Sequence, residues 1–155
     1  MDEAQLYREV LEDIISICSE PASRDDKLQA VCILISEQLE GCDWVGFYIV
    51  NPANQRELIL GPFVGEETEH KKIPIGRGVC GMAAMEGKTI MVDDVSMESN
   101  YLSCSPDVKS EIVVPVKKDG RVVAELDIDS KEASTFDEFH AALFGRICEE
   151  VASLF

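Results

Sequence analysis

Two cysteines and a set of acids lie within one stretch of the sequence, residues 73–129. Cys80 follows the glycine-rich run Gly76–Val79, and Cys104 lies 24 residues later in a polar segment. Thiols can be oxidised and reduced reversibly, and carboxylates can hold a small cation. The sequence therefore predicts redox chemistry on a small cationic substrate, with the acids at Glu111, Asp127 and Asp129.

The two central cysteines differ in their expected reactivity. A short helix is predicted from about Val79 to Met85, so that the helix dipole would lower the pKa of the Cys80 thiol. The acidic surroundings of Cys104 would raise its pKa, so the residues alone leave open which cysteine attacks first. The other cysteines fall on apolar helical faces or at the start of a strand, where a free thiol packs as a small hydrophobe: Cys18, Cys32, Cys42 and Cys148.

The glycines also match a nucleotide-binding pattern, Gly76-x-Gly78-x-x-Gly81. Pro74 interrupts the preceding strand, however, and no parallel βαβ unit comes before it. We interpret the glycines as a turn. There is no Cys-x-x-Cys pair and there are only two histidines, so we expect neither a metal nor an organic cofactor.

The acids are expected to share one face of a hairpin. Asp127 and Asp129 are two residues apart on a strand, so their side chains point the same way. A solvated strand face is the simpler interpretation of such a pair. If the acids instead cluster with Glu111, their repulsion should raise one pKa, and the neutral carboxyl could donate a proton while the ionised ones hold an ammonium group.

The register of this hairpin depends on its loop, which contains Asp119-Gly120. A two-residue loop would place Glu111 on the apolar face, opposite Ile128. A three-residue loop, with Gly120 in a left-handed bulge, would place Glu111 opposite Asp127. The second register leaves the other face uniformly apolar, so we predict the three-residue loop.

The scaffold is predicted as α+β. Helices are expected over residues 3–18, from Ser23 to about Gly41, and from a capping box at Thr135–Glu138 to the C-terminus. Strands are expected at 44–50, 57–63, 73–75, 89–92 and in the final hairpin. This order predicts one domain, residues 1–155, with a mainly antiparallel sheet, the N- and C-terminal helices on one face and a loop-covered pocket on the other.

The first strand supplies the aromatic part of that pocket. Residues 44–50 are β-branched and aromatic without polar alternation, so both faces of the strand should be covered. Trp44 and Tyr48 are expected on the face of the acids. The long polar segment from Asp93 to Lys109 is predicted to be a functional loop without regular structure.

Composition limits the partners. Thirty acidic and fourteen basic residues give a net charge of −16, which disfavours nucleic acid and anionic membranes. The acidic start of the chain lacks the pattern of a signal peptide, and no apolar run is long enough for a membrane span. We therefore expect a cytoplasmic protein.

Several motifs taken together resemble a known family, the free methionine-(R)-sulfoxide reductases. They are Trp44-Val45-Gly46-Phe47-Tyr48, Leu60-Gly61-Pro62-Phe63-x-Gly65, Ile73-Pro74-Ile75-Gly76-Arg77-Gly78-Val79-Cys80-Gly81, Ser110-Glu111-Ile112-Val113-Val114-Pro115 and Leu126-Asp127-Ile128-Asp129-Ser130. The resemblance covers nearly the whole chain from Asp43. It implies a single GAF-like domain and the reduction of the R epimer of free, not peptide-bound, methionine sulfoxide.

The resemblance also implies roles for individual residues. Cys104 would be the nucleophile and Cys80 the resolving cysteine, and the disulfide between them would be recycled by thioredoxin or a similar dithiol. The acids Glu111, Asp127 and Asp129 would bind the substrate amino group and supply a proton. Trp44 and Tyr48 would wall the pocket, Asp94 lies in a matching stretch as a further substrate-binding candidate, and a homodimer is compatible with the resemblance.

The sequence departs from the family at two positions. His70 stands where many members have a third cysteine, which implies a two-cysteine variety. Glu125 replaces a small residue and adds an acid. The sequence leaves two other functions open: a GAF module that binds a small ligand without turnover, and a thiol redox sensor. The first would not use the cysteines, and the second would leave the acids and aromatic residues without a role.

Overall fold

The computed structural model describes residues 2–98 and 107–155. Its helices are α1 (Glu3–Ser19), α2 (Arg24–Gln38), α3 (Gly78–Glu86) and α4 (Glu138–Val151), with short 3₁₀ turns η1 (Val95–Met97) and η2 (Ala152–Leu154). Its strands are β1 (Trp44–Asn51), β2 (Asn54–Val64), β3 (Lys72–Pro74), β4 (Ile90–Val92), β5 (Ser110–Lys118) and β6 (Arg121–Ser130).

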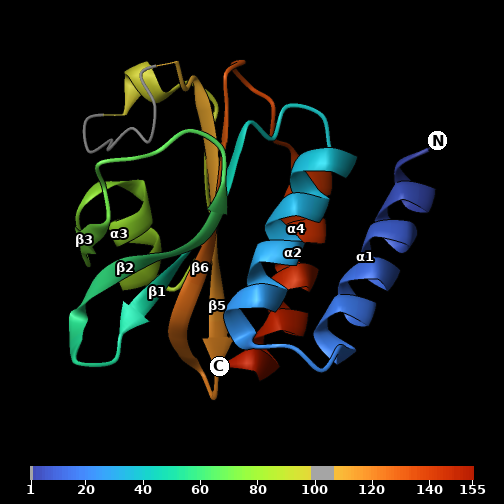
Figure 1. Ribbon diagram of the computed structural model, residues 1–155. Helices are drawn as coiled ribbons and strands as arrows, with labels where there is room; N and C mark the ends of the chain where they lie inside the picture. Colours follow the sequence, from blue (N-terminus) through green and yellow to red (C-terminus); the bar gives the residue numbers. More distant parts are fainter. Residues whose placement is uncertain (1, 99–106) are drawn as a thin grey trace.

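The strands form one antiparallel sheet in the order β3-β2-β1-β6-β5-β4. Helices α2 and α4 cover one face, and α1 packs across both of them (Figure 1). The opposite face, where the pocket was expected to be covered by loops, is partly covered by α3. The predicted α+β class, with the terminal helices on one face, is confirmed. None of the described helices is long and apolar enough to cross a membrane.

Each face of the sheet has its own apolar core. Val45, Phe47 and Ile49 of β1 point toward the helices α2 and α4. Trp44 and Tyr48 point to the other side, where they pack with residues of α3. The predicted division of β1 between two covered faces is therefore confirmed, and it explains why this strand shows no polar alternation.

Capping signals set the helix ends, with one difference from the sequence prediction. The Ser23 hydroxyl accepts a hydrogen bond from the Asp26 backbone N–H at 3.1 Å, so the predicted start of α2 is confirmed. Helix α4 begins at Glu138 with Asp137 as its cap, not Thr135. The Thr135 hydroxyl is within 2.7 Å of the Ser130 hydroxyl and so anchors the preceding turn instead.

The β5–β6 hairpin also differs from its predicted register. Its loop has two residues, because Lys118 pairs with Arg121 while Asp119 and Gly120 adopt φ values of 53° and 78°. These left-handed conformations fit the type I′ turn that favours Asp-Gly. The predicted three-residue loop is therefore wrong.

A bulge restores the expected faces of this hairpin. The register shifts by one residue between Val116 and Lys117, and Val123 is the extra residue on β6. Beyond the bulge Glu111 lies opposite Asp129, not opposite Asp127. There the pairing differs from the prediction by two residues, so the side chains from Ala124 to Asp129 keep their predicted faces. Val122, between the bulge and the turn, packs on the face of α3 instead.

Candidate active site

Four carboxylates lie together on the face of the sheet that carries α3. Each has an exposed fraction of 1% or less: Glu111, Glu125, Asp127 and Asp129. Cross-strand pairing sets them in rows, because Asp129 lies between Trp44 and Glu111, and Glu125 lies beside Tyr48. Neighbouring residues on paired strands have side chains about 5 Å apart. The acids therefore form a buried cluster and not the solvated strand face that was the simpler interpretation.

Helix α3 brings a thiol to this cluster. Cys80 is the third residue of α3, and its side chain is 6% exposed. Its Sγ atom and one carboxylate oxygen each of Glu111 and Asp127 lie within 4.8 Å of one another. The helix packs on β5 and β6, which carry the two acids. The predicted placement of Cys80 at a helix start is confirmed.

The glycine-rich run makes this close approach possible, and it forms a turn, as expected. The Gly76 N–H donates to the Gly81 carbonyl at 2.8 Å and folds the chain back before α3. A Cβ atom on Gly81 would lie 2.6 Å from the Pro74 carbonyl oxygen, so a larger residue would push α3 away from the strand before it. The run connects β3 to α3 within an antiparallel sheet, which is unlike the nucleotide-binding context.

Burial sets the protonation of two of the acids. Burial raises the pKa of Glu111 well above its usual value, and the negative charges of Asp127 and Asp129 raise it further. The Glu111 carboxyl also shares hydrogen bonds with those two carboxyls. Two carboxyl groups can bond to each other only when one of them carries the proton. The raised pKa favours the neutral form of Glu111, and a neutral carboxyl can donate a proton near neutral pH.

Glu125 is the acid that the sequence prediction left out of the site. Burial raises its pKa well above the usual value and Asp127 adds to this, whereas the Cys80 thiol lowers it. Neither carboxylate oxygen meets a partner at full hydrogen-bond geometry among the described residues. The sequence could have predicted this position. Glu125 is two residues before Asp127 on the same strand, and side chains two residues apart point to the same face.

An aromatic wall closes one side of the cluster. The Trp44 ring stacks between Tyr48 and Phe63, at centroid distances of 6.3 Å and 5.4 Å. The Trp44 Nε1–H donates to the Glu66 carbonyl at 2.9 Å, and the Tyr48 hydroxyl donates to the His70 carbonyl at 2.8 Å. Backbone carbonyls of the loop after β2 therefore bind the polar group of each ring. Trp44 and Tyr48 lie on the face of the acids, as expected, and Phe63 joins them.

Asp94, a further predicted site residue, is not buried with this cluster. Asp94 is exposed, and its carboxylate accepts hydrogen bonds from the Ser96 N–H and hydroxyl at 3.0 and 2.7 Å. These bonds lower its pKa and cap η1, the one short turn described within the loop that was expected to have no regular structure. Cys104, the predicted nucleophile, lies outside the described residues.

The remaining described cysteines are free thiols, as expected. Burial raises the pKa of Cys42 to about 12 and raises the pKa values of Cys32 and Cys148 even more. Cys18 is half-buried, and its pKa is raised as well. A thiol that stays protonated is a poor nucleophile. These four cysteines therefore act as packing residues.

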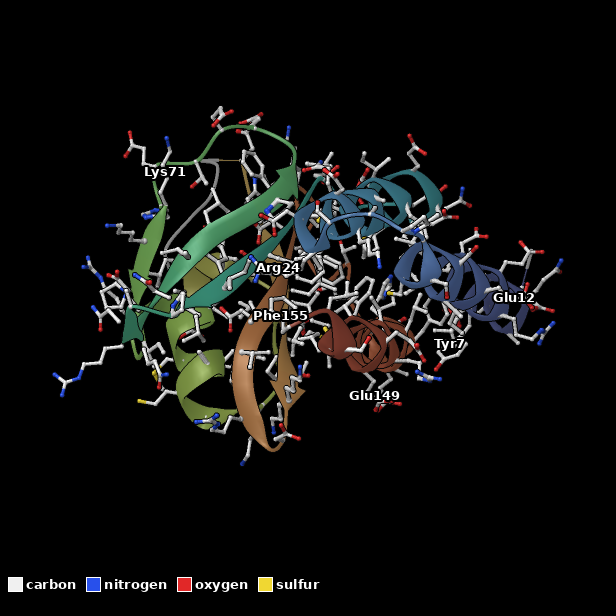
Figure 2. The ribbon with its side chains drawn as sticks, turned by 60° about the horizontal axis from the view of Figure 1, so that its bottom comes forward. Tyr7, Glu12, Arg24, Lys71, Glu149 and Phe155 are labelled. Carbon is white, nitrogen blue, oxygen red and sulfur yellow. The ribbon has the colours of Figure 1, made fainter. Side chains whose placement is uncertain are left out.

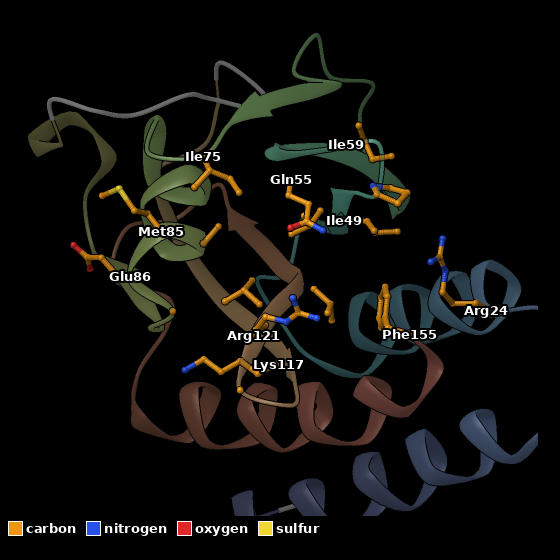
Figure 3. Close-up of a pocket in the computed structure, with 17 residues that line it drawn as sticks. Arg24, Ile49, Gln55, Ile59, Ile75, Met85, Glu86, Lys117, Arg121 and Phe155 are labelled. Atoms are coloured by element: carbon orange, nitrogen blue, oxygen red, sulfur yellow. The ribbon is translucent and has the colours of Figure 1, made fainter.

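A cavity of about 750 Å³ lies at the other end of the sheet, where the β1–β2 and β5–β6 hairpins separate (Figure 3). Apolar side chains such as Ile49 and Phe155 line it, together with Arg24, Lys117 and Arg121. None of the predicted site residues within 2–98 and 107–155 borders this cavity. The acid cluster, which combines a thiol with acids of raised pKa, is the better candidate for chemistry.

The wall depends on a glycine beneath the indole ring. A Cβ atom on Gly46 would lie 2.5 Å from Trp44 Cη2 and 2.8 Å from Phe63 Cβ. We expect Gly46→Ala to displace the ring and destabilise the protein by roughly 1–3 kcal/mol. Urea unfolding followed by fluorescence of Trp44, the only tryptophan, measures this.

Gly145 gives the matched control, because nothing lies within 4 Å of a Cβ atom built there, in the middle of α4. Gly145→Ala should stabilise the protein by up to about 1 kcal/mol through helix propensity. Equal effects of the two substitutions would contradict the predicted role of Gly46.

Comparison with known proteins agrees with this fold. The sequence model of the GAF-domain family matches residues 21–155 of this chain. The protein is 38% identical over 132 residues to GAF domain-containing protein A of Dictyostelium discoideum, a match that covers 85% of this chain and 81% of that protein. The chain belongs to the GAF-domain family.

The more specific resemblance is also confirmed. The structure superposes on free methionine-R-sulfoxide reductase from Neisseria meningitidis, solved in complex with its substrate, with a TM-score of 0.93 and 39% identity over 100% of this chain and 91% of that chain. The free methionine-R-sulfoxide reductase of Escherichia coli is 29% identical over 150 residues, which is 97% of this chain and 82% of that enzyme.

Proposed function

We propose that this protein reduces free methionine (R)-S-oxide to methionine. The observation that carries this proposal is the Cys80 thiol within 4.8 Å of buried carboxylate oxygens of Glu111 and Asp127, beneath an aromatic wall. Enzymes of that name are similar to this chain over nearly its full length. The substrate has an ammonium group, a polar sulfoxide and an apolar methyl group. Carboxylates would bind the first, the thiol and a neutral carboxyl would meet the second, and the aromatic wall would contact the third.

The first step transfers the sulfoxide oxygen to a cysteine. The Cys104 thiolate attacks the sulfoxide sulfur, and Glu111 or Asp127 protonates the oxygen. Methionine leaves as the sulfur gains two electrons, and Cys104 becomes a sulfenic acid. We favour Glu111 as the donor, because burial raises its pKa and so favours its neutral form. The role of Cys104 is carried over from the family resemblance.

The second step regenerates the thiols. The Cys80 thiol condenses with the sulfenic acid to form a disulfide and release water. An external dithiol, which we propose to be thioredoxin, then reduces this disulfide by exchange. Such recycling requires a reducing compartment, so we propose a cytoplasmic location. We also propose, from the resemblance alone, that the protein forms a homodimer.

The acid cluster offers a reason for selectivity. Asp127 and Asp129 lie on the same face as Glu111, and in ionised form they would hold the substrate ammonium group. A methionine sulfoxide within a peptide has an amide in place of the ammonium group. It would leave the buried carboxylates without a counter-charge, which is costly. The free amino acid would therefore be the preferred substrate.

Turnover tests the proposal directly. We expect the purified protein with a dithiol reductant to reduce free methionine (R)-S-oxide, and to leave the S epimer and a peptide-bound sulfoxide unchanged. Cys104→Ser should abolish turnover, because the nucleophile is lost. Cys80→Ser should allow a single turnover and then stop. Cys18→Ser is the matched control and should keep full activity, because Cys18 lies on the opposite side of the sheet.

Other results would change the assignment. Loss of the first turnover in Cys80→Ser, with normal turnover in Cys104→Ser, would reverse the roles of the two cysteines. If no sulfoxide is reduced by the wild-type protein, the reductase proposal is wrong and a ligand-binding GAF module is the better account.

A further inference from the structure

The thiol and the acids also have the composition of a metal site. Sγ of Cys80 and one oxygen each of Glu111 and Asp127 lie within 4.8 Å of one another, and all three side chains are buried. They come from three different elements, α3, β5 and β6. A tetrahedral ion with bonds of 2.0 to 2.3 Å has ligand atoms about 3.5 Å apart, so small side-chain rotations would complete the set.

Unused acceptor atoms point to a ligand at the same place. Oε1 of Glu111 is buried and meets no hydrogen-bond partner among the described residues. Both carboxylate oxygens of the adjacent Glu125 are also buried without a partner at full hydrogen-bond geometry. A buried acceptor without a partner destabilises the folded protein, and a bound cation would remove that cost. Four acids in one buried cluster add a strong preference for positive charge.

We propose that the reduced protein binds a thiophilic divalent cation, of which Zn²⁺ is the physiological example, through Cys80, Glu111 and Asp127. On binding, the sulfur–metal bond forms as the S–H bond breaks, and the proton passes to the solvent. The carboxyls likewise bind as carboxylates and release any proton that they carry. No electron is transferred. The fourth position of a tetrahedral ion would be open to water or to the Glu125 carboxylate.

The nature of the ligands selects the metal. Thiolate excludes Mg²⁺ and Ca²⁺, which prefer oxygen ligands alone. Zn²⁺ and Cd²⁺ accept sulfur and carboxylate oxygen together. The ion is not needed for the reaction proposed above and does not act as a cofactor in it. It occupies the acids and the thiol that the reaction uses.

Metal binding would therefore inhibit the enzyme, a consequence that rests on the proposed function. The substrate ammonium group and the ion would compete for the same carboxylates. Oxidation of Cys80 to the proposed disulfide would remove the thiolate and release the ion. Metal binding and turnover would thus exclude each other, and activity would respond to free zinc as well as to sulfoxide.

Cadmium is the probe for the binding itself, because a cadmium–thiolate bond produces a charge-transfer absorption in the ultraviolet. Titration of the reduced wild-type protein with Cd²⁺ should produce this band with one equivalent bound per chain. Cys80→Ser should remove it. Glu111→Gln and Asp127→Asn should each weaken the apparent affinity by about tenfold or more. Cys18→Ser and Glu12→Gln are the matched controls and should bind as the wild type does.

Two results would overturn the proposal. One is a band that survives Cys80→Ser, which would place the metal on another thiol. The other is a band lost in Cys80→Ser but unaffected by both acid variants, which would show a thiol that binds metal without the cluster. Methionine (R)-S-oxide should displace Cd²⁺ from the wild-type protein. If Cd²⁺ binds as expected but the sulfoxide does not displace it, the metal site stands. Only its link to the proposed reaction would then be wrong.

Discussion

Glu111→Gln should lower kcat for free methionine (R)-S-oxide by about 10²–10⁴-fold, with a smaller change in KM. Glutamine has the shape of a protonated glutamate but no acidic proton to give. Burial first, and then Asp127 and Asp129, raise the pKa of Glu111, which favours the protonated form that can act as the proton donor. Its loss would remove a stabilisation that exists only in the transition state, and such losses reduce kcat.

Steady-state kinetics of three variants measure this effect. Glu12→Gln is the control, because Glu12 is exposed on α1, on the far side of the helical layer (Figure 2). Asp127→Asn is the comparison, and we expect it mainly to raise KM because it removes a charge that binds the ammonium group. A raised KM with unchanged kcat in Glu111→Gln would assign the proton to Asp127 instead. Circular dichroism of each variant excludes misfolding as the cause.

The faces of the strands could be predicted from the sequence, but their pairing could not. The unbroken apolar run of β1 indicated two covered faces, and the structure divides it into Trp44 and Tyr48 on one side and Phe47 on the other. The alternation in β6 likewise placed Asp127 and Asp129 together. These inferences succeed because side-chain direction follows from the backbone period alone.

The hairpin shows where such inference fails. The Asp119-Gly120 loop and the apolar face required different registers, and the chain satisfies both by a bulge at Val123. No local residue signals the bulge, because its advantage comes from burial of the whole face. The start of α4 failed for a similar reason. Threonine is a good helix cap, but the Thr135 hydroxyl is hydrogen-bonded to the Ser130 hydroxyl, a contact that depends on the fold.

In the candidate active site, one feature could be predicted from the sequence and others could not. The sequence predicted that Cys80 begins a short helix, but not that this helix lies over β5 and β6, with the thiol beside Glu111. That contact joins segments about 30 residues apart and depends on close packing at Gly81. Glu125 was noticed only as an extra acid. Its importance depends on complete burial, which the residue type argues against.

Glu125→Gln should stabilise the protein at neutral pH and weaken the dependence of its stability on pH. Burial and Asp127 raise the folded-state pKa of Glu125 above its unfolded value of about 4.3. Between these two pKa values the folded state holds the proton and the unfolded state does not. The free energy of unfolding therefore falls as pH rises through this window, by up to about 1.4 kcal/mol per pH unit for one such group.

Glu111 contributes a fall of the same sign, because its pKa is raised too. Glu125→Gln should thus remove one of two contributions, so that the curves of the variant and the wild type separate progressively above about pH 4.3. Urea unfolding at several pH values from about 5 to 8 measures the separation, with Glu12→Gln as a control that should run parallel to the wild type. If the Glu125→Gln curve also ran parallel, Glu125 would ionise alike in the folded and unfolded states. The carboxyl would then have to be hydrated in solution, and the cluster would be open to water.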